Sequence, residues 1–278
     1  MRIPPILSAV LMLLMTSCMA ENLLLHANNM AQQAQLTQKY LTVGQFTLNT
    51  YSRINNPNKP IHIYIEGDGF AWVSKYQLST DPTPKQALAL QLASVDTAEN
   101  VVYIARPCQF NQFETSTCDS AYWSNKRFAP EVIASMNDAV SYFAQQLKVS
   151  VPAVHLIAYS GGAAVAVLLT AQRCLKTCDI ASIRTVAGNL DTELLNQTHH
   201  VSAMPESLNP INVAKAIQNI PQIHFVGQDD QRVPASIVAS FMLKQTGSCS
   251  SLIKVKNVDH EHGWVENWSH LLQNTPKC

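Results

Sequence analysis

Short apolar runs alternate along the chain with longer amphipathic stretches. Residues 61–65 alternate isoleucine with His62 and Tyr64 and are soon followed by a glycine, which is typical of a strand that runs into a tight loop. Similar apolar runs predict five further strands, at residues 100–106, 153–160, 182–188, 222–227 and 251–258. A weaker alternation over residues 44–53 predicts one more strand, at the edge of the sheet.

Between these strands, hydrophobic residues recur at helical spacing. This pattern predicts helices at residues 84–94, 130–147, 161–174, 210–220, 234–245 and 264–273. Strands separated by helices of this length imply parallel crossovers, and therefore a mostly parallel sheet with helices on both faces. Folds of this α/β class bind their ligands beyond the carboxyl ends of the strands, so we expect the chemistry there.

The first 20 residues predict a signal peptide. Arg2 precedes an apolar run over residues 3–15, which is shorter than the roughly 20 residues that span a membrane. The segment ending at Cys18 is similar to a bacterial lipobox, in which Cys18 would be lipidated; the alternative is signal-peptidase cleavage before Glu21. We therefore expect an exported protein of the bacterial periplasm or outer membrane, with membrane contact only through an anchor at Cys18.

Composition favours a single folded domain after this signal. Residues 21–43 form a polar lead, and residues 44–278 suit one α/β domain. Nineteen basic residues balance 19 acidic ones, and only 14% of residues are charged, against about 25% in typical domains. Without a basic block the chain has no surface suited to nucleic acid, so DNA and RNA are excluded as partners. No feature of the sequence sets an oligomeric state.

Six of the 7 cysteines remain once Cys18 is set aside, and an even number suits disulfides in an oxidising compartment. Six cysteines allow 15 connectivities. Proximity along the chain favours Cys108 with Cys118, Cys174 with Cys178, and Cys249 with Cys278. The competing interpretation, a thiolate metal site, lacks the C-x-x-C spacing that structural zinc prefers.

The strand at 153–160 ends in Ala158-Tyr159-Ser160-Gly161-Gly162 and leads directly into a helix. This segment resembles the nucleophile elbow G-x-S-x-G of the α/β-hydrolases, with Ala158 in place of the first glycine. A serine on such a sharp turn needs small neighbours, because larger side chains would collide with the adjacent strand and helix. The resemblance implies that Ser160 is a nucleophile and that the Gly161 amide can donate to an oxyanion.

The segment from Gly227 to Pro234 resembles the G-x-x-D-x-x-V-P sequence that carries the acid of many α/β-hydrolases. Matched residue by residue, the resemblance implies that Asp230 orients a histidine and stabilises its imidazolium form. Asp229 is the neighbouring alternative. Asp191 is a more distant one, since some hydrolases carry the acid after the preceding strand.

Two histidines compete for the general base after the last strand. His260 lies in V-D-H, which resembles a pattern of exported bacterial members, and His262 lies in H-G-W, which looks like the His-Gly-aromatic sequence of other hydrolases. Either fits the family order of serine, acid and histidine, and we favour His260. A metal cluster in D-H-E-H is the remaining alternative, but no third ligand is identifiable.

The turn after the first core strand, Glu66-Gly67-Asp68-Gly69, resembles the H-G-x segment of the family, with Glu66 replacing the histidine. By that match the Asp68 amide completes an oxyanion hole with Gly161. Aromatic residues near the strand ends are candidate pocket-lining residues: Phe70, Trp72, Trp123, Tyr159 and Trp264.

The resemblance to the α/β-hydrolase superfamily extends over roughly residues 44–272. It is closer to exported bacterial hydrolases that carry A-R-P-C-Q, here residues 105–109, followed by Cys118 and by Tyr-Trp at 122–123. It implies a serine hydrolase that cleaves a carboxylic ester of a small-molecule acyl substrate through an acyl-enzyme, with no metal or organic cofactor. The alternative is a lipid-anchored binding protein that keeps the fold without turnover.

Overall fold

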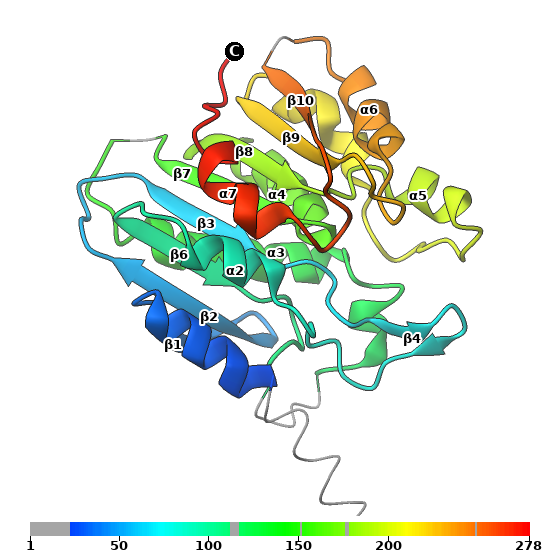
Figure 1. Ribbon diagram of the computed structural model, residues 1–278, viewed down its shortest axis with the longest axis horizontal. Helices are drawn as coiled ribbons and strands as arrows, with labels where there is room; N and C mark the ends of the chain where they lie inside the picture. The colour runs from blue at the N-terminus through cyan, green and yellow to red at the C-terminus, as the bar shows by residue number, and fades with distance from the viewer. Residues whose placement is uncertain (1–22, 112–116, 151, 176–177, 248) are drawn as a thin grey trace, which may run out of the picture.

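The computed structural model describes residues 23–111, 117–150, 152–175, 178–247 and 249–278 (Figure 1). Eight strands form one sheet in the order β1-β2-β6-β3-β7-β8-β9-β10. They are β1 (Thr37–Val43), β2 (Phe46–Ile54), β3 (Ile61–Ile65), β6 (Asn100–Ile104), β7 (Val154–Tyr159), β8 (Ile180–Val186), β9 (Gln222–Gly227) and β10 (Ser250–Val255). The strands from β6 to β10 in this order are parallel, so the predicted α/β class with a mostly parallel sheet is confirmed.

The edge of the sheet differs from the prediction. We expected the strand at residues 44–53 to be an edge strand, but β2 is paired on both sides, antiparallel to β1 and to β6. The true edge strand, β1, lies in the predicted polar lead of residues 21–43, and residues 23–33 of that lead form a helix. The fold therefore begins before residue 44. The predicted signal peptide at residues 1–20, including the lipobox at Cys18, lies outside the described residues.

Helices cover both faces of the sheet (Figure 1). On one face lie α2 (Leu88–Ser94), α7 (Trp264–Leu271) and the helix at residues 23–33. On the other lie α3 (Pro130–Ala144), α4 (Gly161–Arg173), α6 (Ala235–Leu243) and the 3-10 segment η2 (Pro210–Ile217), where we had predicted a regular helix at 210–220. Sequence alone did not predict α5 (Thr192–Thr198) or the 3-10 turn η1 (Ser120–Trp123).

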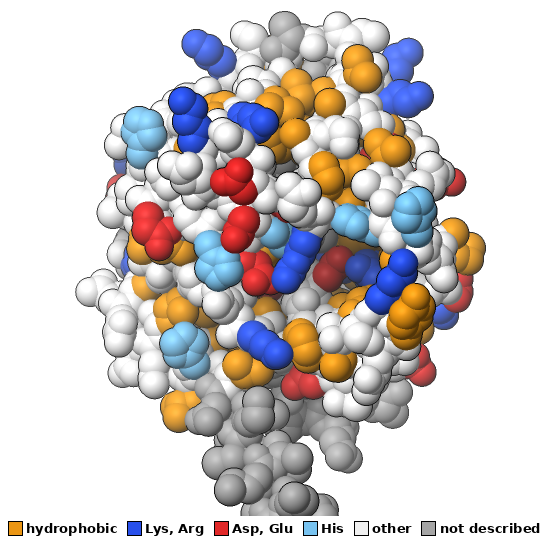
Figure 2. Space-filling view, turned by 45° about the vertical axis from the view of Figure 1, so that its right-hand side comes forward, with side chains coloured by type: hydrophobic (Ala, Val, Ile, Leu, Met, Phe, Trp, Pro, Cys, Tyr) orange, Lys and Arg blue, Asp and Glu red, His pale blue; other side chains and the backbone are white. Residues whose placement is uncertain are grey.

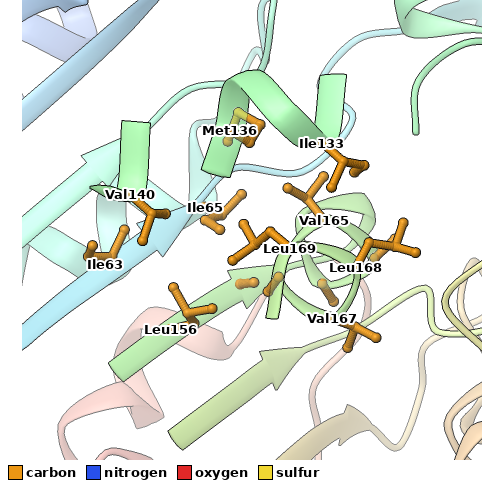
Figure 3. Close-up of a cluster of buried hydrophobic side chains, with 14 of the residues drawn as sticks. Ile63, Ile65, Ile133, Met136, Val140, Leu156, Val165, Val167, Leu168 and Leu169 are labelled. Carbon is orange, nitrogen blue, oxygen red and sulfur yellow. The ribbon is translucent and has the colours of Figure 1, made fainter. Parts of the chain in front are cut away.

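The alternation of β3 divides its side chains between the two layers. Ile61, Ile63 and Ile65 belong to the cluster under α3 and α4, whereas Tyr64 belongs to the cluster under α2 and α7. Figure 3 shows the first cluster, where isoleucine and leucine side chains of β3 and β7 meet aliphatic side chains of α3 and α4. Each buried side chain of this size contributes about 1.5 to 3 kcal/mol, so the cluster holds the strand ends rigidly for the loops that follow them.

The three disulfides pair as proximity along the chain predicted. Cys108 is bonded to Cys118, Cys174 to Cys178, and Cys249 to Cys278. The first closes a loop that follows β6, and the last ties the C-terminal residue to the segment before β10. In the described part of the chain, no set of three or more His, Cys, Asp or Glu side chains is placed to hold a metal ion. The same residues include no helix that is both long enough and apolar enough to cross a membrane.

Candidate active site

Ser160 occupies a strained turn between β7 and α4. Its φ of 50° and ψ of −119° lie outside the regions that residues with a side chain prefer, at a cost of about 1 to 3 kcal/mol. Backbone hydrogen bonds hold the turn. The Ser160 amide donates to the Val186 carbonyl over 2.9 Å, and the Ser160 carbonyl accepts from the amides of Ala163 and Asn189 over 3.1 and 3.0 Å. The strain is thus held by the sheet and helix that flank it.

The two glycines after Ser160 allow close packing against the loop that follows β3. A Cβ atom at Gly162 would lie 2.5 Å from the carbonyl oxygens of Ile65 and Glu66. One at Gly161 would lie 2.1 Å from Oδ1 of Asp68. Any larger residue at either position would push the loop away from Ser160, so the small residues of the elbow serve the contact with this loop.

A chain of hydrogen bonds joins Ser160 to Asp230 through His260. Ser160 Oγ lies 3.0 Å from His260 Nε2, and His260 Nδ1 lies 2.8 Å from Asp230 Oδ2. The other carboxylate oxygen of Asp230 accepts from the amides of Arg232 and Val233, each over 2.8 Å. With the Asp230 carboxylate as acceptor, the Nδ1 atom of His260 carries the proton, and Nε2 is free to accept a proton from Ser160.

Neighbouring side chains fix the position of His260. Tyr159 Oη and Trp264 Nε1 each donate to the His260 carbonyl oxygen over 3.1 Å. The Tyr159 ring also lies beside the imidazole, with ring centroids 5.3 Å apart. Trp264 is fully buried and so does not line the pocket as we expected; it holds the histidine loop from behind.

The alternative candidates lie elsewhere. His262 is exposed, and its imidazole forms a hydrogen bond with the Asp259 carboxylate. This hydrogen bond raises the pKa of the His262 imidazole. Asp229 is also exposed. Asp191 is buried, but it caps α5 through the Leu194 amide and accepts from the Ser240 hydroxyl over 2.8 Å. The structure therefore brings His260 and Asp230 to Ser160, and not His262, Asp229 or Asp191.

The loop after β3 lies next to Ser160, as the oxyanion-hole match requires. Among the described residues, neither the Asp68 amide nor the Gly161 amide has a hydrogen-bond acceptor. The Asp68 carboxylate lies against Gly161 and pairs with two arginines, with Oδ1 3.2 Å from Arg106 Nη1 and Oδ2 2.9 Å from Arg127 Nη1. The carboxylate is thereby fixed, and the backbone at Asp68 is fixed with it.

Glu66 supports the same loop from below. Its buried carboxyl accepts from the Gly67 amide over 2.9 Å, from the Ala89 amide at the start of α2 over 3.4 Å, and from the Tyr103 hydroxyl over 3.1 Å. Burial raises the pKa of Glu66 to about 7. The residue that replaces the family's histidine is thus a structural link between the loop and α2.

Gln109 completes this support, and the sequence analysis assigned it no role. Its Nε2 donates to the Gly67 carbonyl over 2.9 Å, and its Oε1 accepts from the Arg106 amide over 3.0 Å. Arg106 and Gln109 both belong to the A-R-P-C-Q segment, which we had quoted only as part of a resemblance. That segment could have indicated the supporting role of Gln109, because it groups a cationic and an amide side chain directly after a buried strand.

A cavity of about 550 Å³ opens above Ser160 and His260. Phe70, Trp72 and Tyr159 line it as expected, whereas Trp123 is buried and donates to the Ser79 carbonyl over 3.0 Å. Figure 2 brings this side of the molecule forward and shows a hollow surrounded by basic, acidic and histidine side chains. The ionisable residues of the lining are Glu66, Asp68, Lys85, Arg127, Arg232, His260 and Glu261.

Comparisons with solved structures agree with this architecture. An esterase from Pyrococcus furiosus is 11% identical, with a TM-score of 0.59, over 87% of this chain and 91% of that one. The α/β-hydrolase GrgF from Penicillium sp. sh18 is 14% identical, with a TM-score of 0.60, over 86% and 95% of the two chains. Est1E from Butyrivibrio proteoclasticus is 11% identical, with a TM-score of 0.57, over 85% and 98%. At these identities the likeness shows the α/β-hydrolase fold.

No curated protein sequence matches the chain. A family model described as serine hydrolase (FSH1) matches residues 85–263, a range that contains Ser160, Asp230 and His260. This range is more than half of the 278 residues. The chain therefore belongs to the serine hydrolase (FSH1) family and has the α/β-hydrolase fold.

Proposed function

We propose that the protein hydrolyses a carboxylic ester, with Ser160 as nucleophile, His260 as general base and Asp230 as the acid that orients it. One observation carries the proposal: the hydrogen bonds of 3.0 Å from Ser160 to His260 and 2.8 Å from His260 to Asp230, at the base of an open cavity. Such a chain matches the geometry required of an activated serine.

In the acylation step Ser160 Oγ attacks the ester carbonyl carbon while its proton passes to His260 Nε2. Asp230 stabilises the imidazolium that results. The amides of Asp68 and Gly161 donate to the oxyanion, and each donor of this kind typically contributes about 10²- to 10³-fold in rate. The tetrahedral intermediate then collapses, the alcohol leaves with the proton of His260, and the acyl group stays on Ser160.

Deacylation repeats the sequence with water. His260 Nε2 accepts a proton from the water molecule as its oxygen attacks the acyl carbon. The second tetrahedral intermediate expels Ser160 Oγ, which takes back the proton from His260. The carboxylic acid departs, and every group of the protein is restored.

The cavity supports a small-molecule acyl substrate. Its volume of about 550 Å³ is in the range of ordinary ligand pockets, and its wall combines Phe70, Trp72 and Tyr159 with charged groups. We also propose that the protein acts after export, in the periplasm or at the outer membrane. Three disulfides support this part, because such bonds persist in oxidising compartments.

The test is covalent labelling with a fluorophosphonate probe, followed by peptide mapping, together with hydrolysis of short p-nitrophenyl esters. The parent protein should carry the probe on Ser160 and turn over the esters, and Ser160→Ala should do neither. Ser202→Ala, at an exposed serine, is the matched control and should behave as the parent does. An unlabelled parent that turns over no ester would favour a binding protein with a hydrolase fold.

A further inference from the structure

Exposed hydrophobic side chains gather on one hairpin beside the cavity. The hairpin consists of β4 (Trp72–Ser74) and β5 (Gln77–Leu78), which pair only with each other. Trp72 is 41% exposed, Val73 52% and Tyr76 89%. These are three of the nine large hydrophobic residues exposed in the described chain, and they lie within five positions. The hairpin extends from the body of the molecule, and among the described residues no other helix or strand covers its tip (Figure 1).

The base of the hairpin is well anchored. Ala71 and Leu78 pack against Trp123 and the Cys108–Cys118 disulfide. The Ser79 amide donates to the Ala71 carbonyl over 3.0 Å, and Trp123 Nε1 donates to the Ser79 carbonyl over 3.0 Å. The apolar tip is therefore held in its exposed position by a packed base.

Charge and side-chain type together indicate what the tip contacts. Residues 69–80 contain Lys75 and neither Asp nor Glu. Lys85 adds a second positive charge nearby, with its Nζ 3.9 Å from the centroid of the Phe70 ring. Tryptophan and tyrosine favour the boundary between water and lipid, because their rings are amphipathic, and lysine pairs with anionic headgroups. An exposed apolar tip that carries a lysine is typical of a surface that lies on anionic lipid.

We propose that the β4–β5 hairpin docks the enzyme on an anionic phospholipid surface. Phe70, Ala71 and Trp72 line the cavity above Ser160, so the hairpin that enters the lipid is continuous with the wall of the cavity. Docking places the cavity mouth at the interface, where apolar esters are concentrated. Docking does not depend on the proposed function; only the use of ester substrates to measure its effect on turnover rests on that function.

Brominated phospholipids quench tryptophan fluorescence only when the indole reaches the acyl chains, which makes Trp72 a built-in probe. Trp72 is exposed, whereas Trp123, Trp264 and Trp268 are buried. Full-length protein is mixed with vesicles of brominated phosphatidylcholine and phosphatidylglycerol. We expect quenching that saturates with lipid and that Trp72→Phe abolishes. Quenching that survives Trp72→Phe would contradict insertion of the hairpin.

Variants of the tip separate this contact from any other contact with the vesicle. Val73→Ser combined with Tyr76→Ser should weaken the apparent lipid affinity reported by Trp72 by about tenfold or more. Lys75→Glu should weaken it on anionic vesicles and leave it unchanged on purely zwitterionic ones. The matched control is Leu243→Ser at the end of α6. This leucine is 85% exposed, close to the 89% of Tyr76, and its replacement should leave the lipid affinity unchanged. Equal affinities for all variants would overturn the proposal.

The functional readout compares two substrates. The Val73→Ser and Tyr76→Ser combination should hydrolyse a water-soluble short-chain ester as fast as the parent, because neither residue lines the cavity. It should hydrolyse an ester embedded in vesicles about tenfold more slowly. Lipid quenching without turnover of either ester would reject the proposed function and leave the docking intact. Normal turnover of both esters by the variant, without quenching in the parent, would reject the docking alone.

Discussion

The side chain of Gln109 donates a hydrogen bond from Nε2 to the carbonyl oxygen of Gly67 over 2.9 Å. This contact joins the segment after β6 to the loop that continues with Asp68, which lines the cavity. Gln109 is 1% exposed, and its other amide atom accepts from the Arg106 backbone. The loop beside Ser160 is thus held by a buried amide that lies outside the cavity lining.

Replacing Gln109 should therefore weaken stabilisation of the transition state more than binding of the substrate. We expect Gln109→Leu to lower kcat by about 10²-fold, because a displaced oxyanion donor costs that much, and to change KM little. Gln109→Glu keeps the shape but replaces the donor with an acceptor, so it should show a similar loss. Steady-state kinetics on a soluble ester measures both constants. Gln146→Leu, at an exposed glutamine, is the control, and a wild-type kcat in Gln109→Glu would contradict the role of the donor.

The ion pairs of Asp68 give a prediction about stability. Asp68→Asn keeps the backbone N–H but leaves the Arg106 guanidinium, which is 4% exposed, without its carboxylate. We expect a loss of about 3 kcal/mol in the free energy of unfolding, measured by urea denaturation. Adding Arg106→Met should recover part of that loss, since the unpaired charge is then removed. Strictly additive losses in the double variant would show that the two side chains do not interact.

The choice between the two histidines is directly testable. His260→Gln should lower kcat by about 10⁴-fold or more, and Asp230→Asn by a similar factor. His260 accepts the proton of Ser160, and Asp230 orients the imidazole that does so. His262→Gln should keep kcat within about twofold, since that side chain is exposed and pairs with Asp259. Asp191→Asn is the control for the acid. An asparagine oxygen still accepts from the Leu194 amide, so this variant should keep the cap of α5 and leave kcat unchanged; a loss of kcat there would argue against Asp230.

The raised pKa of Glu66 predicts how the free energy of unfolding depends on pH. Burial raises its pKa from the usual 4.5 to about 7, so between these values the folded protein holds a proton that the unfolded chain has released. Its contribution to stability is therefore largest below pH 4.5 and falls, by a total on the order of 3 kcal/mol, as the pH rises to 7 and above. Glu66→Gln keeps the acceptor for the Gly67 amide and removes this titration.

As the pH rises from 5 to 8, the free energy of unfolding of the parent should accordingly fall relative to that of Glu66→Gln. Urea titrations at several pH values measure it. Asp119→Asn, at an exposed carboxylate, controls for the general effect of removing one acid. Parallel curves for the parent and Glu66→Gln would show that Glu66 titrates normally.

Much of the fold could be predicted, because its central strands are buried on both faces. The isoleucines of residues 61–65 and the apolar run before Ser160 leave no other arrangement for these segments. The order of serine, acid and histidine came from the resemblance to the α/β-hydrolases, whereas the parallel strands explain only why the carboxyl ends that carry these residues meet at one edge of the sheet. The choice of His260 over His262 depended on a resemblance, because both lie in the same turn.

Other features depend on contacts that no local pattern reveals. The edge strand β1 has a half-exposed, largely polar sequence, so its hydrophobic signal is weak. The hairpin at β4 and β5 is too short for any periodicity. The contacts of Arg106 and Arg127 with Asp68 join positions that are 38 and 59 residues apart, and only the folded chain shows them.

Cys108 stands between Arg106 and Gln109, and its bond to Cys118 closes a loop that begins two residues after Arg106 and contains Gln109. The disulfide therefore adds a covalent restraint to the residue that donates to the Gly67 carbonyl. Ser160, His260 and Asp230 lie outside the loop that this bond closes, so the restraint acts on the support of the turn after β3 and not on their chain of hydrogen bonds.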